Sequence, residues 1–287
     1  MNPYQAGMTR LSATDSDRNL TFGVVVFYPS LGQEQRVSLG PFTADLVADG
    51  ILPAQKFPLI AFSHGGGSSP FVYRDLACEL ARRGFIVLMP IHPGNSREDN
   101  SLADTIENLE RRPRHLSLAL TALLASPLFA GKVNEEQIVV MGHSMGGYTA
   151  LAASGAKGWA GFGQPLKTEA DPRFRAAILL APATGWFPVN DSLSSISIPT
   201  LLVYAEHDRI CPRWQAQLVM DLLPTPLLTT RMIENAGHFS FLSPFPPAMA
   251  TPTFPPSQDP AGFDRAGFQG ELVEMVDHYL TTAFSKE

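Results

Sequence analysis

The chain has 287 residues, of which 45% are hydrophobic and 17% charged, a composition typical of a soluble globular protein of one or two domains. Its net charge of −6 argues against the basic surface that nucleic-acid binding requires. No run of about 18 apolar residues predicts a membrane span, and residues 1–10 lack the pattern of a secretory signal. We therefore expect a cytoplasmic protein, with a secreted mature form that has lost its signal as the alternative.

Strand-like and helix-like segments alternate along the chain. The expected strands are 21–28, 35–39, 57–63, 85–90, 137–142, 176–181, 199–205 and 227–233, and the expected helices are 71–83, 101–126, 145–154, 212–223 and 265–283. Pro113 is expected to kink or divide the second helix. The alternation predicts an α/β fold in one domain, residues 1–287, with a mostly parallel central sheet and helices on both faces. The first two strands, with no helix between them, are expected to form an antiparallel edge.

A glycine-rich segment, Ser63-His64-Gly65-Gly66-Gly67, follows the expected strand 57–63. It is similar to the His-Gly-Gly-Gly motif of esterases and lipases, whose glycines let backbone N–H groups approach a substrate carbonyl closely. We expect the amide of Gly66 to be one donor of an oxyanion hole.

The pentapeptide Gly142-His143-Ser144-Met145-Gly146 lies between the expected strand 137–142 and the helix that follows it. In that context G-x-S-x-G indicates a nucleophile elbow, a sharp turn on which a side chain at Gly142 or Gly146 would be crowded. The dipole of the following helix favours negative charge near Ser144. We expect Ser144 to be the nucleophile and the amide of Met145 to be the second oxyanion donor.

A serine hydroxyl needs a base and an orienting acid. His238 follows the strand 227–233, and Asp208 follows the strand 199–205. The order Ser144, Asp208, His238 is the chain order of α/β-hydrolase triads, and each residue lies where a parallel strand should end. Glu206 is the second candidate for the acid, because only a small shift of the turn separates it from Asp208.

Together these segments resemble the serine α/β-hydrolase superfamily, and within it the dienelactone-hydrolase-like group that adjoins the platelet-activating-factor acetylhydrolases. The resemblance rests on 57–67, 84–94, the elbow and 237–242, and it runs from about Val24 onward. Two departures stand out. Dienelactone hydrolase proper has a cysteine where this chain has Ser144, and the stretch 178–183, where the acid of the eukaryotic acetylhydrolases is found, has no carboxylate.

Three excursions interrupt the regular pattern near the expected active-site edge: 155–172, 184–198 and 239–263. The third contains seven prolines and five phenylalanines, which indicates a segment that packs down rather than a disordered one. We expect these excursions to form a pocket wall or lid. The expected substrate-binding residues are Trp186, Phe187, Phe239 and Phe241.

No metal or cofactor is expected, because the seven histidines form no metal-binding motif. Cys78 and Cys211 give no disulfide framework, and Cys211 follows Asp208 closely enough to line the site. The predicted function is hydrolysis of small-molecule carboxylic esters through an acyl-enzyme, as in carboxylesterases and lipases. An amidase or peptidase of the same fold is the alternative. A binding protein that retains the hydrolase fold is less favoured, because such proteins often lack the serine or histidine.

Overall fold

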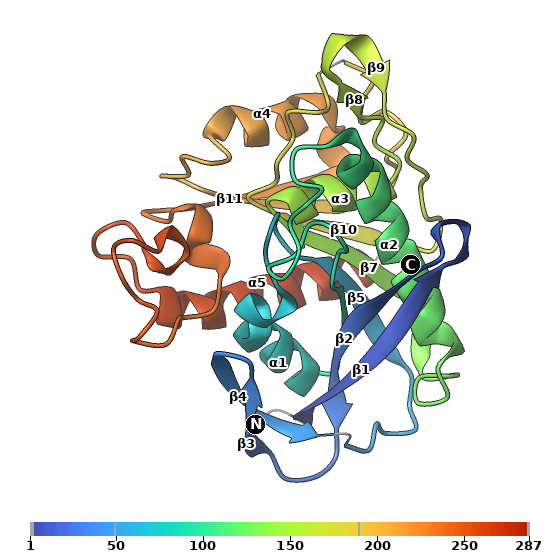
Figure 1. Cartoon of the computed structure of the whole chain (residues 1–287), viewed down its shortest axis with the longest axis vertical. Coiled ribbons are helices and arrows are strands. Elements are labelled where there is room, and N and C mark those ends of the chain that lie inside the picture. Colours follow the sequence, from blue (N-terminus) through green and yellow to red (C-terminus); the bar gives the residue numbers. More distant parts are fainter. Residues whose placement is uncertain (1–2, 49, 189, 286–287) are drawn as a thin grey trace.

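The computed structural model describes residues 3–48, 50–188 and 190–285 (Figure 1). Its main sheet has the strand order β12-β11-β10-β7-β5-β6-β2-β1-β4-β3. These strands are β1 (Gln5–Asp15), β2 (Leu20–Ser30), β3 (Gln35–Leu39), β4 (Phe42–Ala48), β5 (Phe57–Ser63), β6 (Ile86–Pro90), β7 (Val133–His143), β10 (Ala176–Leu180), β11 (Thr200–Ala205) and β12 (Leu228–Ile233). A short hairpin, β8 (Trp159–Ala160) and β9 (Gln164–Pro165), is separate from this sheet.

The six strands from β12 to β6 pair in parallel. Their carboxyl ends therefore meet at one edge of the sheet, the edge at which open α/β sheets place their sites. The mostly parallel sheet predicted from the alternation of elements is confirmed, and this edge carries the candidate catalytic residues.

The amino-terminal part of the sheet contains the antiparallel pairs, as predicted, but its pairing differs from the prediction, and β1 pairs with β4 in parallel. Strand β2 pairs with β1 and β6, whereas β3 pairs with β4. The predicted strands 21–28 and 35–39 are therefore not neighbours, because β1 and β4 lie between them. Strand β1 was missed because its small and polar residues form no apolar run. It is held by pairing in register with β2 over all of Gln5–Asp15.

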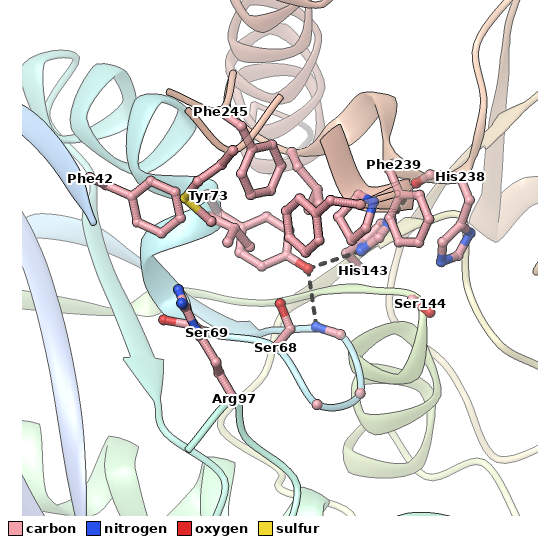
Figure 2. A pocket seen from close by; sticks show the side chains of 18 residues that line it. Phe42, Ser68, Ser69, Tyr73, Arg97, His143, Ser144, His238, Phe239 and Phe245 are labelled. Carbon is pink, nitrogen blue, oxygen red and sulfur yellow. Dashed lines mark hydrogen bonds between the residues drawn. The ribbon is translucent and has the colours of Figure 1, made fainter. Parts of the chain in front are cut away.

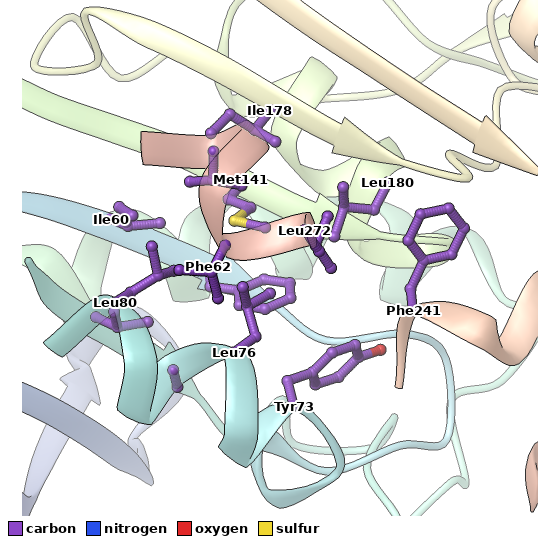
Figure 3. Packing of buried hydrophobic residues seen from close by; sticks show 14 of the residues in the cluster. Ile60, Phe62, Tyr73, Leu76, Leu80, Met141, Ile178, Leu180, Phe241 and Leu272 are labelled. Carbon is purple, nitrogen blue, oxygen red and sulfur yellow. The ribbon is translucent and has the colours of Figure 1, made fainter. Parts of the chain in front are cut away.

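The described residues form five α-helices, which cover the two faces of the sheet (Figure 1). They are α1 (Arg74–Arg82), α2 (Ile106–Ala125), α3 (Met145–Ala153), α4 (Arg213–Leu222) and α5 (Arg265–Phe284). Alternating strand residues separate the faces: Val139 packs with α1 and α5, and Val140 packs with α2, α3 and α4. Figure 3 shows the first of these cores, in which Tyr73 and Phe241 lie beside the buried aliphatic side chains. The helices on both faces thus agree with the prediction.

Helix α2 runs without a break through Pro113, so the expected division of this helix is wrong. Proline lacks the N–H that would bond to the carbonyl four residues earlier, which here belongs to Leu109. The hydroxyl of Tyr148 donates a hydrogen bond to that carbonyl at 3.2 Å instead. The helix begins at Ile106 rather than residue 101 because the Thr105 hydroxyl caps it, accepting from the amide of Asn108 at 3.1 Å.

Short 3₁₀ segments occur at 16–18, 70–73, 161–163, 225–227, 238–241 and 255–257. Over the described ranges, no helix is both long enough and apolar enough to cross a membrane.

Candidate active site

Ser144 occupies a strained turn between β7 and α3. Its backbone angles are φ 57° and ψ −119°, a combination that costs free energy for a residue with a side chain. The turn is closely packed. A Cβ atom added to Gly142 would lie 1.9 Å from the carbonyl oxygen of Gly146, and one added to Gly146 would lie 1.9 Å from that of Ser63. The predicted crowding at these two glycines is confirmed, and it explains why the elbow needs them.

Asp208 and His238, each at the end of a different strand, meet at the same edge of the sheet. Oδ2 of Asp208 lies 2.7 Å from Nδ1 of His238, and both side chains are buried. The other carboxylate oxygen, Oδ1, accepts hydrogen bonds from the amides of Ile210 at 2.8 Å and Cys211 at 2.7 Å. Because the carboxylate only accepts, Nδ1 of His238 donates, and its Nε2 is left free to take a proton.

Ser144 and His238 line one cavity of about 240 Å³ (Figure 2). In the part of the chain that the structure describes, no hydrogen bond joins their side chains. Such catalytic hydrogen bonds are often long until a substrate is bound. The wall of the cavity is mostly apolar, with Phe42, Val72, Phe239, Leu242, Phe245, Met249, Phe254 and Pro256, and its polar lining includes Gly65, Gly66, Gly67, Ser68, Ser69 and Arg97. The site thus places a serine hydroxyl and an imidazole beside an apolar pocket.

Gly66, on the glycine-rich loop, lies next to Met145 at the start of α3. A Cβ atom added to Gly66 would be 3.7 Å from Cβ of Met145. Gly66 lines the cavity, and Met145 is the first residue of α3, where the unpaired amides and the dipole of a helix favour negative charge. The backbone of both residues is therefore close enough to serve one oxyanion.

Tyr73 and His143 connect the glycine-rich loop to the backbone of His238 (Figure 2). The amide of Gly65 donates to the Tyr73 hydroxyl at 3.1 Å, and that hydroxyl lies 2.9 Å from Nδ1 of His143. Nε2 of His143 lies 3.0 Å from the carbonyl oxygen of His238. Since a carbonyl only accepts, Nε2 carries the proton and Nδ1 accepts from Tyr73. Burial, and secondly the charge of His238, hold the pKa of His143 well below its usual range, which fits this neutral tautomer.

Glu206, the second candidate for the acid, faces solvent. Its carboxylate accepts from the amide of Asn235 at 2.8 Å, and it lies 3.9 Å from Nε2 of His207. The structure therefore brings Asp208, and not Glu206, to the imidazole of His238.

The four aromatic residues predicted to bind substrate take different positions. Phe239 lines the cavity, with its ring edge-on to His238 at a centroid distance of 5.2 Å. Trp186 packs against Tyr148 and lines a separate hollow beside Met145.

The expectation that Phe187 and Phe241 line the substrate pocket disagrees with the structure. Both side chains are 0% exposed. Phe187 stacks on Tyr148 in one core, and Phe241 packs against Phe268 in the other, directly beneath His143. Phe241 is close to His238 in the sequence, but this does not fix the direction of its side chain. The 3₁₀ turn at 238–241 points successive side chains to different sides.

Cys211 is buried beside the pair of Asp208 and His238. The potential ligand atoms of these three residues lie within 4.8 Å of one another, which is the one group of metal-ligand type found among the described residues. Burial, with a smaller contribution from Asp208, raises the pKa of the Cys211 thiol to about 12. Asp208 already accepts three hydrogen bonds, from Nδ1 of His238 and from the amides of Ile210 and Cys211, an arrangement that suits acid–base chemistry.

Comparison with known proteins gives a consistent result. A model of the alpha/beta hydrolase family matches residues 60–195. Cutinase 2 of Thermobifida cellulosilytica is 27% identical over 83% of this chain and 80% of its own length. A bis(hydroxyethyl) terephthalate hydrolase of Streptomyces coelicolor is 28% identical over 76% of this chain and 56% of its own length. The solved structure of a ferulic acid esterase from Streptomyces cinnamoneus has the same fold, with a TM-score of 0.72 and 20% identity over 98% of this chain and 90% of that one.

We predict that Tyr73→Phe weakens both the fold and the site. The substitution leaves the Gly65 amide and Nδ1 of His143 without their buried partner, which should lower the free energy of unfolding by about 1–3 kcal/mol. It should also lower kcat for ester hydrolysis, because the glycine-rich loop loses a support. Urea unfolding and steady-state kinetics measure the two effects.

Tyr279→Phe is the matched control. The Tyr279 hydroxyl is buried and, within the described residues, has no hydrogen-bond partner. Its removal should therefore leave both stability and kcat close to the wild-type values. Equal effects of the two substitutions would contradict the role given to Tyr73.

Proposed function

We propose that the chain is a serine α/β-hydrolase and, more narrowly, a carboxylesterase- or lipase-like enzyme built as a single domain of residues 1–287. The observation that carries the proposal is the pair of Asp208 and His238, hydrogen-bonded at 2.7 Å beside the cavity that Ser144 also lines. The relatives are named as a cutinase, a bis(hydroxyethyl) terephthalate hydrolase and a ferulic acid esterase, which supports cleavage of carboxylic esters. The narrower resemblance to the dienelactone-hydrolase-like group stays a prediction.

In the proposed mechanism, Nε2 of His238 takes the proton of Ser144 as its oxygen attacks the ester carbonyl. Asp208 holds the imidazole by its Nδ1–H and stabilises the imidazolium that forms. The amides of Gly66 and Met145 donate to the oxyanion. The imidazolium then protonates the departing alcohol, leaving an acyl-enzyme, and His238 activates water for the second step. Each oxyanion donor of this kind is typically worth ~2.7–4 kcal/mol of transition-state stabilisation.

The proposed substrates are small esters with a modestly hydrophobic group. The apolar wall of the cavity supports this, and most of it comes from the stretch 239–263. Arg265 ties that stretch down, donating to the carbonyls of Pro256 at 2.8 Å and Gln258 at 3.0 Å. The proposed role of 239–263 is that of an ordered flap that forms the acyl-binding wall. The excursions 155–172 and 184–198 contribute no residue to this cavity, so the expectation that they form its wall is wrong. They line part of the hollow beside Trp186, together with residues 104–109 and Met145, and are proposed to flank the flap.

The predicted cytoplasmic location stays a proposal, with a secreted mature form as its alternative, and fractionation of the source cells would decide between them.

The nucleophile is tested by Ser144→Ala. Because loss of one triad member costs several powers of ten in rate, ester turnover should fall below about a tenth of the wild-type value by a wide margin. Covalent labelling by a fluorophosphonate probe should disappear, while circular dichroism stays unchanged. Retained turnover would rule out Ser144, and a wild-type chain that does not label would favour a non-catalytic binding protein. Matching nitrophenyl esters and anilides test the amidase alternative, which requires faster anilide cleavage.

The acid is tested by comparing Asp208→Asn with Glu206→Gln. An asparagine at 208 keeps the shape but favours the wrong imidazole tautomer, so kcat should fall by up to ~10⁴. Glu206→Gln removes an exposed carboxylate that does not reach His238, and kcat should stay within about threefold, in the range of ordinary surface substitutions. Comparable losses in the two variants, or a larger loss at Glu206, would overturn the assignment.

The flap is tested by replacing Met249–Ser257 with a short Gly-Ser linker. Met249, Phe254 and Pro256 line the cavity, so their removal should change the ranking of short against long acyl esters more than it changes thermal stability. The same replacement of 161–165, which contributes nothing to that cavity, is the control and should leave the ranking unchanged. If the ranking is insensitive to the first replacement, or if proteolysis of the native enzyme cuts this stretch readily, the flap role is wrong.

A further inference from the structure

Arg112 is a buried cation that the proposed mechanism does not use. It lies on α2, is 0% exposed, and contacts the start of the glycine-rich loop at Ser63 and His64. All its hydrogen-bond acceptors are neutral oxygens: Oγ1 of Thr149 at 3.0 Å, Oδ1 of Asn95 at 2.7 Å, Oγ of Ser63 at 3.1 Å, and the carbonyl oxygen of His64. The guanidinium is thus satisfied in its hydrogen bonds but not in its charge.

No carboxylate of the described residues forms a salt bridge with Arg112. Ten other arginines do pair with an aspartate or glutamate: Arg18, Arg36, Arg74, Arg82, Arg83, Arg111, Arg114, Arg173, Arg175 and Arg265. A buried charge without an opposite charge beside it lowers the stability of a fold. The presence of Arg112 at this position therefore indicates a functional role.

The neighbouring histidines are neutral, so they add no second positive charge beside the guanidinium of Arg112. Burial, and secondly the charge of Arg112, lower the pKa of His64 and of His115 to about 3, and that of His92 well below its usual range. All three rings are therefore neutral at neutral pH. Burial also lowers the pKa of Arg112, to about 9, so the guanidinium remains protonated.

The contacts of Arg112 reach both candidate oxyanion donors. On one side it holds the His64 carbonyl, two residues before Gly66, and Asn95, whose Oδ1 would lie 3.8 Å from a Cβ atom at Gly66. On the other side it donates to the Thr149 hydroxyl, which in turn donates to the carbonyl of Met145 at 3.0 Å. One rigid, planar group therefore links the glycine-rich loop to the first turns of α3, the two segments that would present their amides to the same oxygen.

We propose that Arg112 is the positioning residue of the oxyanion hole: it fixes the amides of Gly66 and Met145, and its uncompensated charge favours the anionic tetrahedral intermediate. The inference rests on the proposed function. A fixed positive charge in a site of low dielectric stabilises negative charge more than it would in water. The substrate ester is neutral and the intermediate is negative, so the effect belongs to the transition state rather than to substrate binding.

The test compares Arg112→Met with the wild type. This substitution removes both the positive charge and the planar set of N–H donors of the guanidinium. We measure kcat/KM for a nitrophenyl ester and the inhibition constants of two ketones of equal chain length. A trifluoromethyl ketone adds Ser144 to form a tetrahedral oxyanion, whereas the methyl ketone stays largely neutral. We expect kcat/KM and trifluoromethyl ketone affinity to fall about tenfold or more, with methyl ketone affinity within about threefold. Arg112→Lys, which keeps the charge alone, should recover part of the loss of trifluoromethyl ketone affinity.

Arg114→Met is the matched control. Arg114 lies on the same helix, two residues further on, but pairs with Asp15 on β1 at 2.8 Å, away from the site. Its loss should lower stability without changing either ketone affinity or kcat/KM.

A folded Arg112→Met variant with unchanged kcat/KM would overturn the proposal, as would an equal fall in both ketone affinities, which a merely structural role predicts. If Arg112→Met does not fold, as judged by circular dichroism, Arg112→Lys decides. A lysine lacks the planar set of donors of the guanidinium, so kcat/KM of Arg112→Lys should fall by about threefold or more. An unchanged kcat/KM would overturn the positioning role. A wild-type enzyme that neither cleaves esters nor labels with fluorophosphonate would refute the proposed function itself, whatever the variants do.

Discussion

The turn at Ser144 is the constraint on which the candidate site depends. A residue with φ 57° and ψ −119° is held there only because β7 and α3 approach so closely that Gly142 and Gly146 leave no room for side chains. The carbonyl oxygen of Ser63 lies against Gly146, so the same close approach also sets the distance between the elbow and the glycine-rich loop. Ser144 and the glycine-rich loop are therefore positioned relative to one another by one packing contact.

Two buried polar networks support that contact from opposite faces of the sheet. On the side of α1, Tyr73 and His143 link the Gly65 amide to the backbone of His238. On the side of α2, Arg112 links the His64 carbonyl to Thr149. Buried networks of this kind are rigid when every member is satisfied. The glycine-rich loop is thus supported from both sides, which suits a loop that must present a backbone amide in a fixed direction.

The wall of the cavity is built differently, from segments that are distant in the sequence. Phe42 comes from β4 and packs against Phe245, which in turn packs against Phe254 in the Pro- and Phe-rich stretch. A wall made of loop residues and a residue of β4, far from β7 in the sheet, can change without disturbing the elbow. In this architecture, selectivity for the ester can therefore vary while the chemistry stays fixed.

The sequence by itself determined the parallel half of the sheet, the five helices and the three strand ends that carry Ser144, Asp208 and His238, because apolar periodicity and glycine spacing are local signals. Only the tertiary structure decided what depends on pairing and direction. Strand β1 exists through its register with β2, and helix α2 passes Pro113 because Tyr148 bonds to the carbonyl of Leu109. Phe241 turns into the core while Phe239 reaches the cavity. In the sequence, Arg112 is only one member of the short basic cluster 111–115. Its role could not be predicted, since the partners of a buried charge are brought together only when the chain has folded.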